Sequence, residues 1–509
     1  SLHELIAKAF IVEKEYFPET VYAFRHPLTQ EVTYDSLLKD RRLRGHADTA
    51  RAYEQLGRVR GDEYASLIAH HYDRAGEALE AVQWYQRAAR WAQRRDPSET
   101  VRLWKRVCTL LDGVPDAPKS PILGLRARSE ILAVGGWRTG LSEAEAARLF
   151  EEGQALSVRC GDALAHARLL EAYGGARGFA GDIEALVEYV GQASKATQDE
   201  ADLGRRAARY RRLMFANLHL GNLKEALALT DQVQELLPGA PEGGPDAPNP
   251  FASLELGPVA FRGLVLAGMG RAEEAEQYLS RAGRLALSPG FTEMVPVLPV
   301  LYLFSTMIAW YKGDVSAADA HSAALAEYAS QSHSTWDAVI AHMCQGQAQI
   351  LSGRATAAAR TFEAGLRLAR ERRVGLEGEA DLLSFQAEAY LDAGDEWRGL
   401  ATAAEAVRVA RERKTRWWEV RAQRAYARAL LLKEGRARAD EADEALQHAL
   451  FLVMETGARA EEPFLRMTLA ELARVRGDEA GRERELSEAR RLFAASGATA
   501  RAAPLAAAV

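Results

Sequence analysis

The sequence predicts an all-α protein made of repeated helix pairs, and three observations carry that prediction. A glycine recurs along most of the chain at intervals of 40, 49, 43, 40, 41, 41 and 42 residues. Small residues follow many of these glycines five and twelve positions later. At 509 residues the chain is too long for one compact core. We therefore expect one helix–turn–helix unit copied along the chain, each copy burying its apolar face against its neighbours. The recurring glycines are Gly181, Gly221, Gly270, Gly313, Gly353, Gly394, Gly435 and Gly477.

The start of the chain differs from the repeats. Residues 10–12 and 21–24 are short runs of aromatic and aliphatic residues on either side of Pro18, and they predict two strands. A helix is expected from Pro27 through Leu38, because proline is favoured in the first turn of a helix.

The repeat unit is clearest in the copy that begins at Phe251. Its first helix ends at Gly270, and its second helix carries Ala275, Tyr278 and Ala282 at five, eight and twelve residues after that glycine. Small residues let the two helices cross closely, and the aromatic ring fills the gap between them. The glycine itself predicts a left-handed turn at the end of the first helix. Small residues also lie seven positions before a turn glycine, at Gly263, Gly346 and Ala387.

Two proline-rich stretches interrupt the pattern. Residues 238–250 contain five prolines and three glycines, so they predict a surface loop, with a binding element as the alternative. Residues 112–122 contain Pro115, Pro118 and Pro121 and separate an N-terminal section from the main array.

Composition narrows the class of partner. The chain has 65 basic and 71 acidic residues, a net charge of -6, so no overall charge recruits nucleic acid or an anionic membrane. Three cysteines far apart in sequence predict a reducing compartment. The longest apolar stretch, residues 294–310, is broken by Pro296 and Pro299 and does not read as a membrane span. A cytoplasmic location is expected.

The N-terminal residues carry a specific resemblance. Residues 24–38, FRHPLTQEVTYDSLL, resemble the winged-helix segment that follows the nucleotide-binding core of bacterial STAND-type signalling ATPases. Residues 67–72, Gly76 and residues 81–88 look like the first repeat after it. The later helix pairs resemble tetratricopeptide repeats, although the usual unit is about 34 residues. The pattern is most similar to multidomain proteins that join a class III adenylate/guanylate cyclase domain, an ATPase and a tetratricopeptide tail.

The resemblance implies a right-handed superhelical solenoid of about ten helix pairs behind a winged-helix remnant. The predicted segments are a winged-helix remnant (1–58), a first helical repeat region (59–111), tetratricopeptide-like repeats (112–237), a Pro/Gly loop (238–250), and further repeats with a C-terminal cap (251–509).

No residue of the sequence is assigned to catalysis, to a cofactor or to a metal. The phosphate-binding loop of an ATPase ends in Gly-Lys followed by Ser or Thr, and no Gly-Lys pair occurs in the sequence. His70 and His71 are adjacent, and His342 and Cys344 are two apart, so neither pair shares one helix face as zinc ligands would. The chain is therefore expected to be no enzyme. By resemblance, ATP and Mg²⁺ would be bound by ATPase and cyclase domains upstream.

Arginines gather on one predicted helix. Arg205, Arg209 and Arg212 recur at helical spacing, with Arg206 and Arg211 alongside. One interpretation is a solvated face paired with acids of a neighbouring helix, such as Glu225 or Glu235. The other is a site for an anionic ligand or for a partner's carboxylates, because guanidinium groups bind such groups with two parallel hydrogen bonds.

A second cluster joins arginines to adjacent indoles. Trp417 and Trp418 are followed by Arg421 and Arg424, a combination that could contact a ligand or a partner, or serve as repeat core. Since the first helix of each unit lines the concave face in this repeat class, Gln345, Gln349, Gln386 and Tyr390 are further candidates.

These features predict a non-catalytic sensor or scaffold arm. A protein or peptide partner, or a small-molecule effector, would bind the concave face and regulate an upstream ATPase or cyclase. The alternatives are a constitutive oligomerisation scaffold, or the tail of a STAND transcription regulator or protein kinase. Nucleic acid and membranes are not expected partners.

Overall fold

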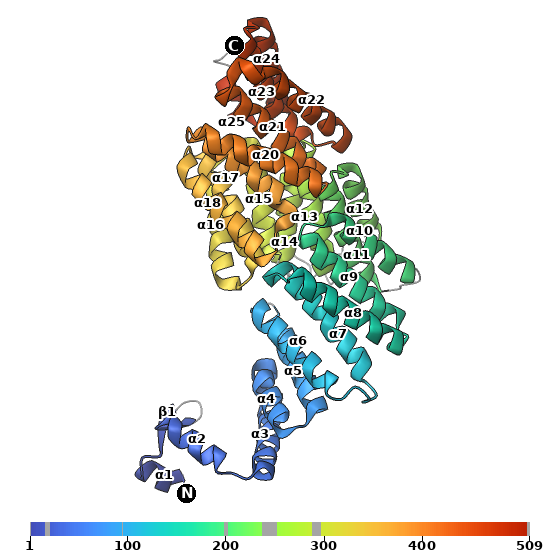
Figure 1. Ribbon diagram of the computed structural model, residues 1–509, viewed down its shortest axis with the longest axis vertical. Helices are drawn as coiled ribbons and strands as arrows, with labels where there is room; N and C mark the ends of the chain where they lie inside the picture. Colours follow the sequence, from blue (N-terminus) through green and yellow to red (C-terminus); the bar gives the residue numbers. More distant parts are fainter. Residues whose placement is uncertain are drawn as a thin grey trace. The chain divides into compact units, whose positions relative to one another are not determined.

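The computed structural model describes residues 2–15, 21–93, 95–197, 202–236, 252–287 and 297–505. The chain divides into two compact units (Figure 1). The first unit comprises residues 1–91 and 106–117, and the second comprises residues 92–105 and 118–509. The division passes through helix α6 (Pro97–Asp112). The five segments predicted from the sequence stay predictions, and the Pro/Gly loop at 238–250 lies outside the described residues.

The first unit begins with a small antiparallel hairpin. Ile11 pairs with Phe24 and Val12 with Ala23, so the two predicted strands are confirmed. The helix expected after them begins at Pro27 but ends at Asp35, three residues before Leu38. The winged-helix identity of this segment rests on the resemblance alone. The elements are α1 Leu2–Ala7, β1 Ile11–Glu15, β2 Val21–Phe24, α2 Pro27–Asp35, α3 Lys39–Arg60, η1 Gly61–Tyr64, α4 Ala65–Ala75 and α5 Ala78–Ala92.

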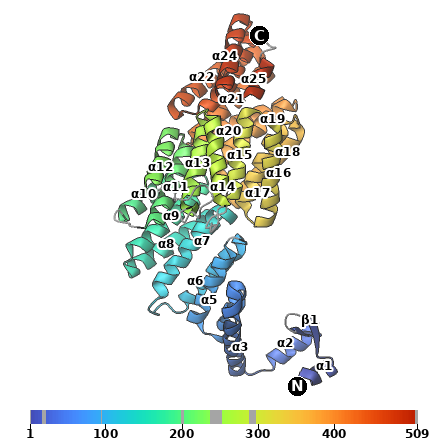
Figure 2. The same ribbon diagram turned by 180° about the vertical axis from the view of Figure 1, so that it is seen from behind.

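The second unit is all-α and consists of tetratricopeptide-like helix hairpins placed side by side (Figures 1 and 2). Its first elements are α7 Ser120–Val134, the π-helical turn η2 Gly135–Thr139, α8 Glu143–Cys160, α9 Ala163–Phe179, α10 Ile183–Ala196, α11 Leu203–Leu220, α12 Leu223–Leu236, α13 Ala252–Gly268, α14 Ala272–Ala286, α15 Leu298–Lys312 and α16 Val315–Ser332. The remaining elements are α17 Thr335–Leu351, α18 Ala355–Arg372, η3 Leu376–Gly378, α19 Glu379–Asp392, α20 Glu396–Glu412, α21 Arg416–Lys433, η4 Gly435–Arg438, α22 Ala439–Thr456, η5 Arg459–Glu461, α23 Glu462–Arg476, α24 Glu479–Ala495 and α25 Thr499–Leu505.

The turn glycines and the small residues at helix crossings, both predicted from the sequence, are confirmed. All eight glycines of the series have positive φ angles, between +56° and +93°. The small residues lie where helices cross: a Cβ added at Gly346 would overlap the ring of Phe362 on the second helix of the same hairpin. At Gly263 an added Cβ would come 2.9 Å from Leu279. Glycine at these positions therefore permits a close approach that a larger residue would prevent.

The hairpins of the second unit do not stack in a simple row, because the array winds back on itself. Helix α11 contacts α21, η2 contacts α17, the α13 hairpin contacts η5, and α15 contacts α25. As a result, the first helices of the later hairpins face a neighbouring turn of the array instead of solvent. Every residue of α19 from Glu379 to Leu391 is buried. The open concave groove expected from the sequence is therefore filled at α19 and α21.

Contacts between successive turns of the array join residues that are far apart in sequence. The Arg413 guanidinium donates to the backbone oxygen of Ala180 at 3.2 Å, and the Lys414 Nζ lies 2.6 Å from a carboxylate oxygen of Glu184. Gly181 lies directly at this crossing, since an added Cβ there would overlap the Arg413 guanidinium. Gly181 thus serves two purposes: it ends a helix and it leaves room for Arg413 of the adjoining turn of the array.

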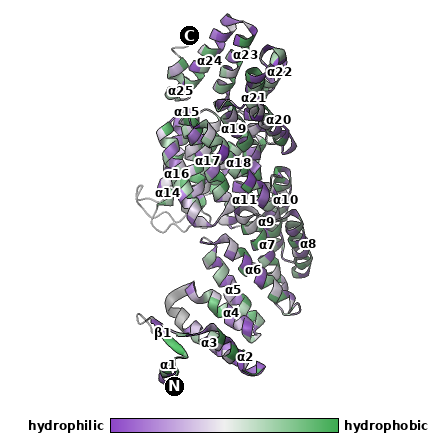
Figure 3. Cartoon of the chain, turned by 60° about the vertical axis from the view of Figure 1, so that its left-hand side comes forward, coloured by the Kyte–Doolittle hydropathy of each residue, from purple (hydrophilic) through white to green (hydrophobic). Residues whose placement is uncertain are grey.

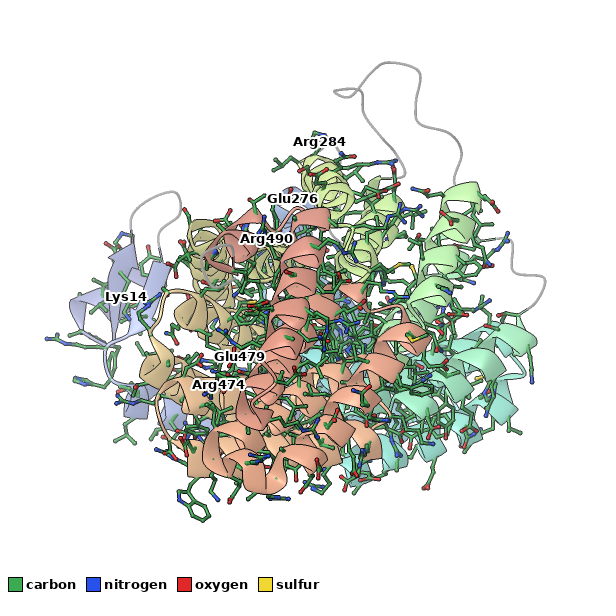
Figure 4. The ribbon with its side chains drawn as sticks, turned by 90° about the horizontal axis from the view of Figure 1, so that it is seen from above. Lys14, Glu276, Arg284, Arg474, Glu479 and Arg490 are labelled. Carbon is green, nitrogen blue, oxygen red and sulfur yellow. The ribbon has the colours of Figure 1, made fainter. Side chains whose placement is uncertain are left out.

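The outer faces of the helices are polar. Figure 3 shows helices that carry hydrophilic and hydrophobic residues together, as expected for helices with one buried face. Charged side chains such as Glu276, Arg284 and Arg474, labelled in Figure 4, are exposed. Among the described residues, no helix combines the length and the apolar character needed to cross a bilayer.

Candidate ligand-binding site

A cavity of about 730 Å³ lies among the inner helices of the second unit. This volume is within the range of about 300–1,000 Å³ typical of small-molecule sites. Its wall is drawn from α7, η2, α9, α10, α11, α13, α15, α17, η3, α19 and α21, which span most of the array. The wall exists only because the array winds back on itself and brings early and late helices together.

Most of the wall is aromatic and aliphatic. The aromatic lining residues are Trp137, Phe179, Phe215, Phe261, Phe304, Trp336 and Trp418. Met307 and Met343 add flexible thioether side chains, which adapt to differently shaped apolar groups. His219 also lines the cavity, and burial lowers its pKa to about 4, so that its ring is neutral near pH 7.

The predicted arginine stripe lies on α11, beside the cavity. Arg209 and Arg212 both bind the carboxylate of Glu171 on α9, at 3.2 Å and 3.0 Å, and Arg205 lies 3.8 Å from Asp202. In the part of the chain that the structure describes, Glu171 and Asp202 thus pair with arginines of the stripe, whereas the sequence had suggested Glu225 or Glu235. Arg212 and Glu171 both line the cavity.

Arg211 differs from its neighbours on α11. It lines the cavity, and its Cδ lies 3.1 Å from the position of a Cβ built on Gly257 of α13. Within the described ranges of the chain, no carboxylate or hydrogen-bond acceptor contacts its guanidinium. Burial lowers the pKa of Arg211 to about 10, with a further contribution from the charge of Arg212. A positive charge without a partner is thus held in a mainly apolar cavity.

Two carboxylates lie in another part of the wall. Glu377 accepts a hydrogen bond from the Trp336 indole at 2.9 Å, but its second oxygen is buried without a hydrogen-bond partner. Burial raises the pKa of Glu377 to about 7. Asp381 pairs with Arg421, and one of its oxygens is likewise unpartnered. These groups give the cavity acceptors as well as the cation of Arg211.

The second predicted cluster lies within the packed interior. Trp417 is fully buried, and its ring stacks on that of Trp418 with centroids 4.5 Å apart. Arg421 is 1% exposed and binds the carboxylates of both Asp381 and Glu461. Trp417 is thus repeat core, one of the two interpretations drawn from the sequence. Arg424 is also buried, and its guanidinium lies 3.1 Å from Glu388.

The polar candidates of the first helices are distributed along α17 and α19 and do not meet in one place. The Thr361 hydroxyl donates to the Gln349 side chain at 2.9 Å, and Gln386 donates to the Tyr390 hydroxyl at 3.3 Å. Gln345 is half-buried on α17. None of these four side chains lines the cavity. Of the ten predicted residues, Arg212 alone is among the lining residues, and a role for the others in binding stays a prediction.

The sequence analysis missed the apolar wall and the special position of Arg211. Each lining residue resembles an ordinary core residue at helical spacing, and the cavity arises from contacts between hairpins more than a hundred residues apart. The arginine stripe could be recognised in the sequence. Glu171, which pairs with Arg209 and Arg212, is 38 and 41 positions away from them and could not. No local signal shows which arginine is left without a partner.

Comparisons with known proteins add little to this description. No protein-family model matches the chain, and no curated protein sequence is similar to it. Among solved structures, the chain is similar to a Rap protein complexed with competence and sporulation factor, at 12% identity and a TM-score of 0.42, over 74% of this chain and 96% of that one. It is also similar to the APC/C hetero-tetramer Cut9–Hcn1, at 12% identity and a TM-score of 0.48, over 87% and 81%. We draw no functional inference from similarity this low.

Proposed function

We propose that this chain is a non-catalytic regulatory arm that senses a small ligand inside its wound repeat array. The observation that carries the proposal is the cavity itself, whose wall is shared between η2 near the start of the second unit and α21 near its end. A molecule in the cavity contacts helices of both turns at once. Its volume favours a small molecule over a peptide or a folded partner, which would need a long open groove.

A ligand there would act by changing how tightly the array is wound. It can shift an equilibrium between two arrangements only if it binds one of them more strongly. In the wound form, α11 and α21 both contribute to the wall, so a ligand that touches both helices favours this form. In a less wound form, these contacts are lost, and the apolar wall is exposed to water.

The resemblance of residues 24–38 to STAND-type ATPases indicates which activity such an arm would regulate. We propose that winding of the array biases an upstream ATPase, and through it a cyclase, between inactive and active states. The nucleotide and Mg²⁺ would be held by those domains and not by this chain. A protein partner would then bind the outer surface of the array, where charged side chains are exposed.

The proposal is tested on the full-length parent protein. ATPase turnover is measured with residues 60–509 present or deleted, and in a variant with Ala208→Trp, which places a large ring at a lining position. An Ala163→Trp variant, at the start of α9 and outside the lining, is the matched control. We expect the ATPase turnover of the deletion protein and of Ala208→Trp to differ from that of the unmodified protein, and the turnover of Ala163→Trp to equal it. The same turnover in all four proteins would rule out the proposal.

A further inference from the structure

We propose that the cavity binds an organic monoanion. The single negative charge of this ligand contacts the Arg211 guanidinium, and its apolar body fills the remaining space. This inference deepens the proposed function, because it rests on the same cavity and names the class of ligand. Three features of the cavity support this ligand class: the Arg211 guanidinium that no acid of the described residues contacts, the apolar wall, and the placement of the acidic groups.

The first part is the contrast between Arg211 and its neighbours. Arg209 and Arg212 share Glu171, whereas the Arg211 guanidinium contacts no acid in the described part of the chain. Arg211 is partly buried on a mainly apolar wall, where a charge without a partner is less well solvated than in water, and a charged hydrogen-bonded partner offsets that cost. A carboxylate suits a guanidinium well, since it accepts two parallel hydrogen bonds from it. An anion therefore supplies the contact that the protein leaves open.

The second part is the apolar wall. Side chains such as Phe215, Phe304 and Met307 offer no hydrogen-bond donors to a sugar or a strongly hydrated ligand, and the Trp336 indole N–H is already bonded to Glu377. Burial of apolar ligand surface against them is favourable at roughly 25 cal/mol per Å². The flexible methionine allows some variation in the shape of the apolar body. A hydrocarbon chain or ring system therefore fits this wall better than a polar molecule of equal size.

The third part limits the ligand to one negative charge. Arg212 already contacts a carboxylate, that of Glu171, which it shares with Arg209, and the Glu377 and Asp381 carboxyl groups line the same cavity. The other lining arginines, Arg138 and Arg212, already contact Asp337 and Glu171, so among the described lining residues a second anionic group would find no arginine without a carboxylate and would be repelled by Glu377 and Asp381. Nucleotides and sugar phosphates are disfavoured for this reason. A monocarboxylate with an aliphatic or aromatic body matches the charges that are present.

Dodecanoate is a suitable probe, with 1-dodecanol as its uncharged counterpart. Binding to the 509-residue chain is measured by titration calorimetry, and a change in tryptophan fluorescence reports contact with the lining residues Trp137, Trp336 and Trp418. We expect one molecule of dodecanoate per chain, bound about tenfold or more tightly than the alcohol, because the charge-assisted contact is lost in the alcohol.

The test variant is Arg211→Gln, and Arg206→Gln is its control on the same helix, outside the lining. Arg211→Gln should weaken dodecanoate binding about tenfold or more and leave dodecanol unchanged, whereas Arg206→Gln should alter neither. Because Arg211→Gln removes a partly buried charge that no acid of the described residues contacts, it should also raise the midpoint of thermal unfolding without ligand. A merely structural role for Arg211 predicts the opposite shift.

Three results would overturn the inference: equal affinity for the acid and the alcohol, dodecanoate binding that Arg211→Gln leaves intact, or no binding of either probe. The first two leave the proposed function standing, because the cavity still takes an apolar ligand. If neither probe binds and Ala208→Trp also leaves ATPase regulation unchanged, the proposed function fails together with the inference.

Discussion

Replacing Arg421 by methionine should destabilise the second unit strongly. The guanidinium is 1% exposed and contacts both the Asp381 and the Glu461 carboxylates. It also donates to the Tyr311 hydroxyl at 3.3 Å and lies 4.4 Å from the Phe385 ring centroid. These residues belong to α15, α19 and η5, so the side chain joins elements of different hairpins.

The expected loss is about 3–5 kcal/mol, the usual cost of removing one partner from a buried ion pair. Methionine preserves most of the volume, so the loss reflects two carboxylates left without a cation. Burial already raises the pKa of Asp381 to about 6 while Arg421 opposes that rise. Without Arg421 the Asp381 carboxyl group becomes easier to protonate, so the destabilisation should be smaller at pH 5 than at pH 8.

The assay is chemical unfolding of the 509-residue chain, followed by tryptophan fluorescence at both pH values. The control is Arg408→Met on α20, because its ion pair with Glu412 is more than half exposed on both sides and its loss should change the free energy of unfolding far less. Adding Asp381→Asn and Glu461→Gln to the Arg421 variant should restore much of the stability. A loss equal to that of the control, or one independent of pH, would refute the reasoning.

Two further predictions concern stability. Burial raises the pKa of Glu377 from 4.5 to about 7, so the stability this group contributes is complete below pH 4.5 and is lost as pH rises through 7. Glu377→Gln should therefore be about 3 kcal/mol more stable than the wild type at pH 8 and similar to it at pH 4.5, in urea unfolding at both pH values. Gly346→Ala should lower the thermal midpoint, because its Cβ overlaps the Phe362 ring, whereas Gly283→Ala, with open space around it, should raise the midpoint by its better helix propensity. Equal midpoints for these two alanine variants would count against tight helix crossing at Gly346.

The repeat structure could be predicted from the sequence because its signals are local. The end of a helix at Gly313 or Gly353 depends on a few neighbouring residues, and all the glycines of the series have positive φ. The two N-terminal strands and the helix that begins at Pro27 were also predictable from short runs of residues. Each of these features reflects a preference of the backbone itself.

The winding of the array could not be predicted in the same way. The contact between Gly181 and Arg413 joins residues 232 positions apart, and nothing in the spacing of the repeats marks it. Arg421 illustrates the consequence. On a single helix pair it would face an open groove, but the adjoining turn of the array encloses it and supplies Tyr311 as a partner. The cavity depends on the same long-range contacts. For this reason the arginines of α11 could be predicted from the sequence, whereas the apolar wall of the cavity could not.

The most direct test of the account is zero-length carbodiimide cross-linking of the chain, analysed by mass spectrometry. Lys414 Nζ lies 2.6 Å from the Glu184 carboxylate on an adjoining turn of the array, and both side chains are more than half exposed. Lys312 lies 2.6 Å from Glu276 on the preceding hairpin, so this pair should react whether or not the array is wound. The account predicts both cross-links. Recovery of the Lys312–Glu276 product without the Lys414–Glu184 product would contradict it, because the turns would then be apart and the cavity would have no wall.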